Sequence, residues 1–260
     1  MFVGFELKTE ESFIDYLEIG KKHYDNSKRQ VYEKLSQFLS KDGSIDGTAM
    51  QNHWFPMIDT DIFISHSHAN KDKAIALAGW LKKEFDLDVF IDSCVWGFAN
   101  DLLLSIDNEY CRNVDDTFYV YEKRNYSTSH VHMMLSTALN MMIDNCECIM
   151  FLNTPESIES EDVIKRTKSP WIYSEIAISK LIRRKKPNRE KVLLEKSVFA
   201  SKELIIKYDV ETEHLIDLTG RDLNVWKSIY HDNKHFHPLD ILYHRHHVAT
   251  MTEENVGIKG

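Results

Sequence analysis

Residues 61–92 constrain the fold most, because two short apolar runs flank an amphipathic stretch. The runs Asp61-Ile62-Phe63-Ile64-Ser65 and Asp88-Val89-Phe90-Ile91-Asp92 have the character of strands buried on both faces. Between them, residues 72–85 place apolar side chains at helical spacing: Ala74, Leu77, Ala78, Leu81 and Phe85. Strand, helix and strand in this order predict a βαβ unit and therefore a parallel sheet.

The rest of the chain extends this pattern into an α/β fold. We expect a helix over 101–110, an irregular insertion or small hairpin over 111–129, a Met-rich helix after it, and a third strand over 147–153. Two weaker apolar runs, 204–206 and 214–219, are typical of edge strands, and residues 221–230 predict a short helix. The expected fold class is a flavodoxin-like parallel sheet flanked by helices.

Three regions are expected along the chain. Residues 8–40 are charged with helical periodicity and a turn cluster follows at 41–47, so we expect residues 1–57 to form an N-terminal helical appendage. Residues 58–220 form the main domain, with the insertion at about 111–129. Residues 221–260 are expected to form a C-terminal helix and tail packed on that domain.

Composition excludes several classes of function. The formal net charge of −9 argues against a general nucleic-acid binder. No apolar run reaches membrane-spanning length, and the N-terminus lacks a basic segment followed by an apolar one, so we expect no membrane contact and a cytoplasmic location. The four cysteines, Cys94, Cys111, Cys146 and Cys148, are expected to be free thiols.

The common cofactor and metal motifs are missing. The sequence contains no GxGxxG, P-loop, HExxH or GxSxG pattern. A phosphoacceptor receiver domain would need acidic groups where this chain has Ser65-His66-Ser67 and Asn153-Thr154. Cys146 and Cys148 lack a second cysteine pair, and the histidines of the tail are expected to be surface residues, so no metal site is expected.

Glu175 is the most unusual carboxylate in the sequence. Ser169 and Pro170 suit the N-cap and first position of a helix, on which Trp171, Glu175, Ile178 and Ile182 share one stripe. Positions 171 and 179 are Trp and Ser, so no cation stands four residues away. A carboxylate on an apolar face is costly to bury, and such groups are often functional.

Several polar groups should meet Glu175 at one edge of the sheet. Ligands of open parallel sheets bind outside the carboxyl ends of the strands. Those ends carry Ser65-His66-Ser67, Asp92 with the following Trp96 loop, and Asn153-Thr154. Each group alone also has a structural explanation, as a turn former, a helix cap or a core residue. Their convergence predicts a binding cleft.

With these pieces in order, the chain resembles the Toll/interleukin-1 receptor (TIR) domains of bacteria. The corresponding segments are 61–67 for the first strand box, 89–92 for the second strand, 93–99 for the BB loop, 148–153 for the third strand, and 169–178 for the box with the W-x-x-x-E pattern. The resemblance covers about residues 58–220. The insertion and the N-terminal appendage lie outside the common domain.

The resemblance implies an activity. Enzymatic TIR domains cleave the nicotinamide–ribose bond of NAD, and the family's catalytic glutamate corresponds to Glu175. The residues expected to line the substrate path are Ser65, His66, Ser67, Asp92, Trp96 and Trp171. NAD is then a substrate, and no cofactor is expected. Such bacterial proteins often serve Thoeris anti-phage defence, in which an ADP-ribose-derived signal activates a partner effector.

Two other functions stay open at this point. Many TIR domains are interaction modules, and here Trp96 and Phe98 flank Gly97 in a loop too short to bury both rings, so self-association through residues 93–99 is expected. A nucleoside deoxyribosyltransferase-like enzyme would also use a glutamate at a ribose. It would lack the Trp171 box and would not act on NAD.

Overall fold

The computed structural model describes residues 2–25, 35–95, 99–161, 164–167, 169–182 and 208–248. The chain divides into two compact units. The first unit contains Met1–His23, Asp59–Ile91 and Ile143–Gly260, and the second contains Tyr24–Ile58 and Asp92–Met142. Among the described helices, none combines the length and the apolar character that crossing a bilayer requires.

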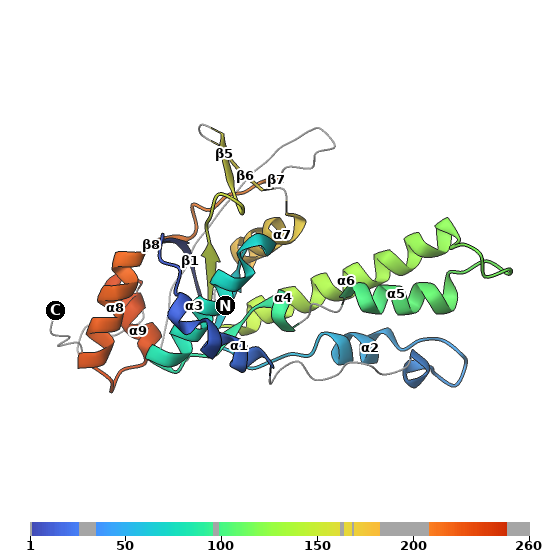
Figure 1. The fold of residues 1–260 in the computed structure, drawn as a ribbon, viewed down its shortest axis with the longest axis horizontal. Coiled ribbons are helices and arrows are strands. Elements are labelled where there is room, and N and C mark those ends of the chain that lie inside the picture. Colours follow the sequence, from blue (N-terminus) through green and yellow to red (C-terminus); the bar gives the residue numbers. More distant parts are fainter. Residues whose placement is uncertain are drawn as a thin grey trace. The chain divides into compact units, whose positions relative to one another are not determined.

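A five-stranded, all-parallel sheet forms the centre of the first unit (Figure 1). Its strands are β1 (Val3–Lys8), β2 (Ile62–Ser65), β3 (Val89–Phe90), β4 (Cys148–Leu152) and β8 (Ile216–Thr219), in the order β3-β2-β4-β1-β8. The expected α/β class is thus correct, and the arrangement is compatible with a flavodoxin-like fold. The βαβ unit of residues 61–92 is confirmed, with α3 (Lys71–Phe85) as its helix.

The N-terminal strand corrects the expectation of a helical appendage over residues 1–57. β1 lies between β4 and β8 and is parallel to both. Phe5 and Leu7 are fully buried. Residues 3–8 therefore complete the main sheet, although Gly4 and Glu6 interrupt the apolar run that a central parallel strand usually shows.

Helices cover both faces of this sheet. Adjacent residues of a strand point to opposite faces, and Phe5 stacks on Tyr243 of α9 (Pro238–Arg245), whereas Ser65 contacts α7 (Pro170–Leu181) from the other face. On the α9 side, α8 (Gly220–Asp232) packs on α3, with the rings of Trp226 and Phe85 stacked 4.0 Å apart. α8 was expected, but α9 was not.

Two glycines bring the N-terminal helices close to α3. The short helix η1 (Ile14–Tyr16) leads into α1 (Leu17–Asp25). A Cβ atom on Gly20 would lie 2.1 Å from the Ile75 carbonyl oxygen, and one on Gly79 would lie 2.2 Å from the Tyr16 carbonyl oxygen. The backbones therefore touch directly, so residues 14–23 belong to the first unit.

The segment between the third predicted strand and the Glu175 helix, residues 156–168, contains two strands. β5 (Glu159–Glu161) and β6 (Ile164–Thr167) form a small antiparallel sheet with β7 (Tyr208–Asp209). The expected edge strand over 214–219 is present as β8. The one expected over 204–206 lies outside the described residues.

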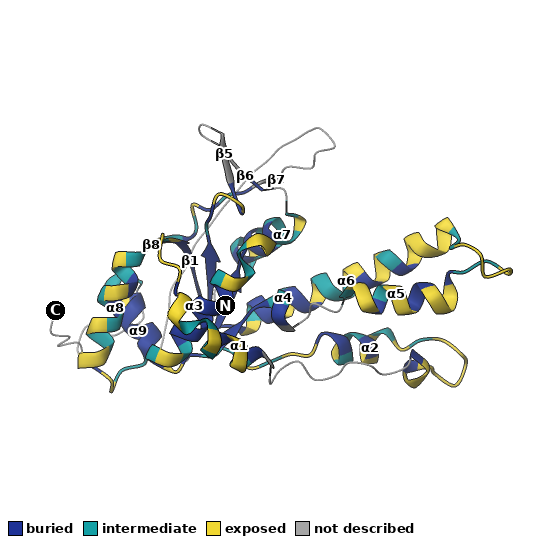
Figure 2. Cartoon of the chain, in the orientation of Figure 1, coloured by how far each residue is buried: buried dark blue, intermediate teal, exposed yellow. Residues whose placement is uncertain are grey.

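The second unit is helical in its described part. It contains η2 (Leu35–Phe38), α2 (Gly47–Trp54), α4 (Asp92–Val95), α5 (Ala99–Tyr110) and most of α6 (Tyr121–Asn145). The buried carboxylate of Asp107 ties α5 to α6, because Ser127 Oγ and Arg124 Nε donate to it at 2.6 Å and 2.8 Å. The outer faces of both helices are exposed (Figure 2). The expected irregular insertion over 111–129 is shorter, because α6 already begins at Tyr121.

Candidate functional site

The helix that carries Glu175 begins where the sequence indicates. The Ser169 side chain accepts a hydrogen bond from the Ile172 N–H at 3.3 Å, and Pro170 opens α7. The buried face differs from the predicted stripe: Ile172, Glu175, Ile176 and Ser179 are buried, whereas Trp171, Ile178 and Ile182 are half-buried. Glu175 belongs to both the predicted stripe and the observed buried face. Relative to the prediction, α7 is rotated so that Ile172 and Ile176 are its buried apolar side chains.

Glu175 meets the carboxyl end of β2. The Ser65 hydroxyl donates to Glu175 Oε2 at 2.5 Å, and the two residues are 1% and 3% exposed. A hydroxyl that donates to a carboxylate stabilises its negative charge and fixes its orientation. The structure thus brings together two residues that lie 110 positions apart and that the sequence placed at one edge of the sheet.

A second buried carboxylate lies in the same row of the sheet. Ser65, Phe151, Glu6 and Asp217 are register partners on β2, β4, β1 and β8, so their side chains leave the same face. Glu6 is 3% exposed and accepts a hydrogen bond from Asn153 Nδ2 at 2.6 Å. Two strand spacings, about 10 Å, separate Ser65 from Glu6 along this row.

Lys8 balances the charge of Glu6 at the end of β1. Its Nζ lies 3.4 Å from Glu6 and 2.5 Å from Asp217. Burial lowers the pKa of Lys8, but the hydrogen bond to Asp217 and the charges of Glu6 and Asp217 outweigh it, so the pKa is raised overall. The ammonium group therefore stays charged at neutral pH, and Glu6 belongs to an ion-paired network.

The loops beside the Glu175 site are held together by polar contacts. Thr154, after β4, donates to Asn70, after β2, at 2.6 Å, and Ser157 closes the turn by accepting from the Thr154 N–H at 2.8 Å. Further along α7, Ser179 Oγ lies 2.8 Å from His214 Nε2. Lys180 forms an ion pair with Glu211. The contacts of Ser179 and Lys180 fix α7 against the segment that leads into β8.

The other predicted site residues have different placements. His66 is buried next to Ser65, and Ser67 precedes the short helix η3 (His68–Asn70). Trp171 stands one turn before Glu175 on α7. Asp92 is the first residue of α4 in the second unit, and Trp96 lies outside the described residues. The direct contact between two predicted site residues that carries the argument is the hydrogen bond from Ser65 to Glu175.

Two groups of polar residues were missed in the sequence. Glu6 and Lys8 were missed because their strand was not recognised, although the alternation of Val3, Phe5 and Leu7 was a usable signal. Glu147, His237 and Asp240 have ligand atoms within 4.8 Å of one another, a spacing that could hold a metal ion. Glu147 precedes β4, so this group lies at the amino edge of the sheet, away from Glu175.

The four cysteines are free thiols, as expected, and all four are buried. Burial raises the pKa of Cys146 to about 11 and raises that of Cys148 as well. Both thiols are therefore neutral at physiological pH and poor nucleophiles.

Comparisons of the chain with family models, with curated proteins and with solved structures found no match. The assignment of a function therefore depends on the motifs of the sequence and on the geometry around Glu175.

Proposed function

We propose that this chain is a TIR-type NAD glycohydrolase or cyclase that cleaves the nicotinamide–ribose bond with Glu175. The observation that carries the proposal is the hydrogen bond from Ser65 to the buried Glu175 at the carboxyl end of β2. Ligands of parallel sheets bind at this edge, and a buried carboxylate there is a common mark of a functional site. The motifs around both residues are those through which the sequence resembles bacterial TIR domains.

One carboxylate is sufficient for this chemistry. Loss of nicotinamide leaves an oxocarbenium-like ribose, and a nearby negative charge stabilises it. The leaving group is a pyridinium that departs as a neutral base, so no acid has to protonate it. In this mechanism Glu175 stabilises the developing positive charge, Ser65 holds the carboxylate in position, and Trp171 offers a ring face on which nicotinamide or adenine stacks.

The burial of Glu175 adds a requirement. At 3% exposure the carboxylate is closed to a dinucleotide, so the site must open before NAD can reach it. This requirement suits an enzyme that stays inactive until it is triggered. We include self-association through the loop 93–99 in the proposal as the opening step, and an ADP-ribose-derived nucleotide as the signal that reaches a partner effector in anti-phage defence.

The test is incubation of concentrated protein with NAD and identification of the products by mass spectrometry. We expect release of nicotinamide, and we expect Glu175→Gln to abolish it, because glutamine can still accept the Ser65 hydrogen bond but carries no charge. Glu213→Gln, at an exposed position before β8, is the matched control and should retain full turnover.

Three results would redirect the proposal. Equal turnover by Glu175→Gln and the wild type would remove Glu175 from the mechanism. If the protein leaves NAD intact but exchanges the base of a deoxynucleoside, it is a deoxyribosyltransferase-like enzyme. If it does neither, even when assembled, the self-association module is the better explanation.

A further inference from the structure

The connection between α5 and α6 presents apolar side chains to solvent on a well-ordered turn. Val114 is fully exposed and Phe118 is 62% exposed. We call residues 113–118 the tip. The valine is uncovered and the aromatic ring is mostly uncovered, and exposed apolar groups of this kind mark interaction sites.

Hydrogen bonds hold the tip in one conformation. The Asn113 side-chain oxygen accepts from the N–H groups of Thr117 at 2.8 Å and Phe118 at 3.1 Å, and the Asn113 N–H donates to the Phe118 carbonyl at 3.0 Å. Arg112 Nε lies 3.2 Å from Asp116 Oδ1. The neighbouring Asp115 has neither a hydrogen bond nor an ion pair within the described part of the chain. The tip therefore offers two apolar groups and one unneutralised carboxylate.

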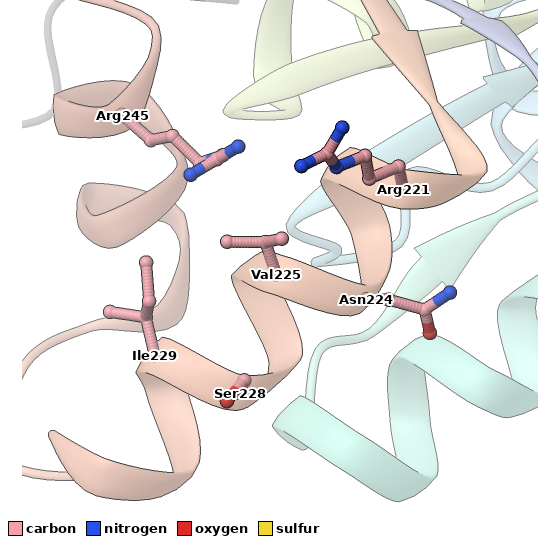
Figure 3. Close-up of a pocket in the computed structure, with 6 residues that line it drawn as sticks. All are labelled: Arg221, Asn224, Val225, Ser228, Ile229 and Arg245. Atoms are coloured by element: carbon pink, nitrogen blue, oxygen red, sulfur yellow. The ribbon is translucent and has the colours of Figure 1, made fainter. Parts of the chain in front are cut away.

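A pocket of complementary character lies on α8 and α9 of the first unit (Figure 3). Its volume is about 710 Å³, and its lining includes Arg221, Arg245, Val225 and Ile229. The guanidinium groups of the two arginines face each other at one end, and the two aliphatic side chains lie beside them. Arg245 is partly neutralised by Asp222, 3.2 Å away. Arg221 is exposed and forms no hydrogen bond or ion pair with any described residue.

We propose that the tip of one molecule docks into the Arg221 pocket of a second copy of this chain. Asp115 pairs with Arg221, and Val114 and Phe118 cover Val225 and Ile229. The chain as a whole is acidic, with a net charge of −9, so two copies repel each other in general. A cationic pocket that receives an acidic tip counteracts this repulsion at the contact.

The contact joins two different surfaces, so it is head-to-tail. Each molecule keeps one unused tip and one unused pocket after the first contact, and assembly continues into a ring or an open filament. A turn of six residues buries little surface, and interfaces below about 1,200 Å² are weak. Assembly is therefore expected only at high protein concentration. This inference does not depend on the proposed catalytic function.

Charge reversal at the two exposed positions tests the contact. Sedimentation velocity of the full chain should show the mass of the wild type growing with concentration. Asp115→Arg alone and Arg221→Glu alone should each remain monomeric, because like charges then meet and the loop 93–99 is expected to act only after the tip contact. An equimolar mixture of the two variants should assemble again, since each reversed charge finds its complement on the other protein. The double variant should also assemble.

Control variants with the same changes of charge are available close to these elements. Asp101→Arg on α5 and Lys234→Glu after α8 lie at exposed positions outside the tip and the pocket, and both should assemble like the wild type. Circular dichroism should show that all variants are folded. The proposal is wrong if the wild type is monomeric at every concentration, if either reversed variant assembles like the wild type, or if the mixture stays monomeric. A tip that binds the pocket of its own molecule would leave the wild type monomeric at every concentration.

Discussion

At the scale of single residues, Trp171 and Trp226 differ in burial, and the proposed function assigns ligand binding to Trp171 and core packing to Trp226. Trp226 is completely buried, stacks on Phe85 and donates its Nε1–H to the Pro238 carbonyl at 2.8 Å. Trp171 is half-buried one turn from Glu175. We expect Trp226→Ala to lower the free energy of unfolding by about 3–5 kcal/mol, the usual cost of such a change in a core.

Trp171→Ala is expected to affect activity more than stability. It should change the rate or the product ratio with NAD and cost much less stability, because its ring is not fully packed. Urea unfolding and turnover per folded molecule, measured on both variants, check this. If Trp171→Ala loses as much stability as Trp226→Ala and keeps its turnover per folded molecule, Trp171 is a core residue.

Cys146 gives a prediction about pH. Burial raises the pKa of its thiol from 9.0 to about 11, while Thr60 Oγ1 lies 3.2 Å from the sulfur. The folded state therefore holds the proton more tightly than the unfolded state. This contribution to stability is complete below about pH 9 and is lost as the pH rises through about 11.

The Cys146→Ala variant isolates this contribution from the lysines and tyrosines that titrate in the same range. We expect the difference in unfolding free energy between wild type and variant to shrink by about 2 kcal/mol as the pH rises from neutrality to about 11. Urea unfolding at a series of pH values measures this difference. A difference that stays constant would show that the thiol ionises equally in both states.

At the scale of elements, β1 decides whether the N-terminus is an appendage or part of the core. Its backbone pairs with β4 and β8, and Val3, Phe5 and Leu7 are buried. Removal of residues 1–8 should therefore abolish cooperative thermal unfolding, because both ladders and four core side chains disappear, those of Phe2, Val3, Phe5 and Leu7. Ile14→Ser, at a largely exposed position of η1, is the control and should leave the transition unchanged. A truncated chain as stable as the wild type would contradict the role of β1.

The elements that could be predicted are those with an unbroken local signal. β2, β3 and β4 are continuous apolar runs, and α7 has a serine N-cap followed by proline, so each was placed from the sequence. β1 was not recognised because Gly4 and Glu6 interrupt it. The buried Glu6 carboxylate accepts a hydrogen bond from Asn153 and pairs with Lys8, and a local apolar pattern reveals neither contact. Whether an interrupted segment such as this one forms a strand depends on its packing against other elements.

At the candidate site, too, the sequence predicted some features and not others. The meeting of Ser65 and Glu175 was predicted because strand ends and helix starts of a parallel sheet share one edge. The partial exposure of Trp171 was not, because α7 is rotated so that Ile172 and Ile176 are its buried apolar residues. The row that links Ser65 to Glu6 requires the strand order, and that order depends on a pairing between residues some 145 positions apart, such as Val3 with Cys148.

At the scale of the whole molecule, the closed site and the proposed contact between copies lead to one last prediction. Glu175 is too buried to receive NAD in a single resting molecule, so assembly is the step at which we expect the site to open. Turnover of NAD per protomer should then rise with protein concentration. It should stay low for Asp115→Arg and for Arg221→Glu, neither of which lies near Glu175 in the chain, and it should recover in their equimolar mixture.

Measuring nicotinamide release and sedimentation on the same samples distinguishes the possible outcomes. If turnover follows the mass of the assembly, the tip contact gates the enzyme. If the mixture assembles but turnover per protomer is flat, the contact exists and another event opens the site. Trp96→Ala belongs in the same assay: loss of activity without loss of assembled mass would mean that the loop 93–99 acts after the tip contact, at the step that uncovers Glu175.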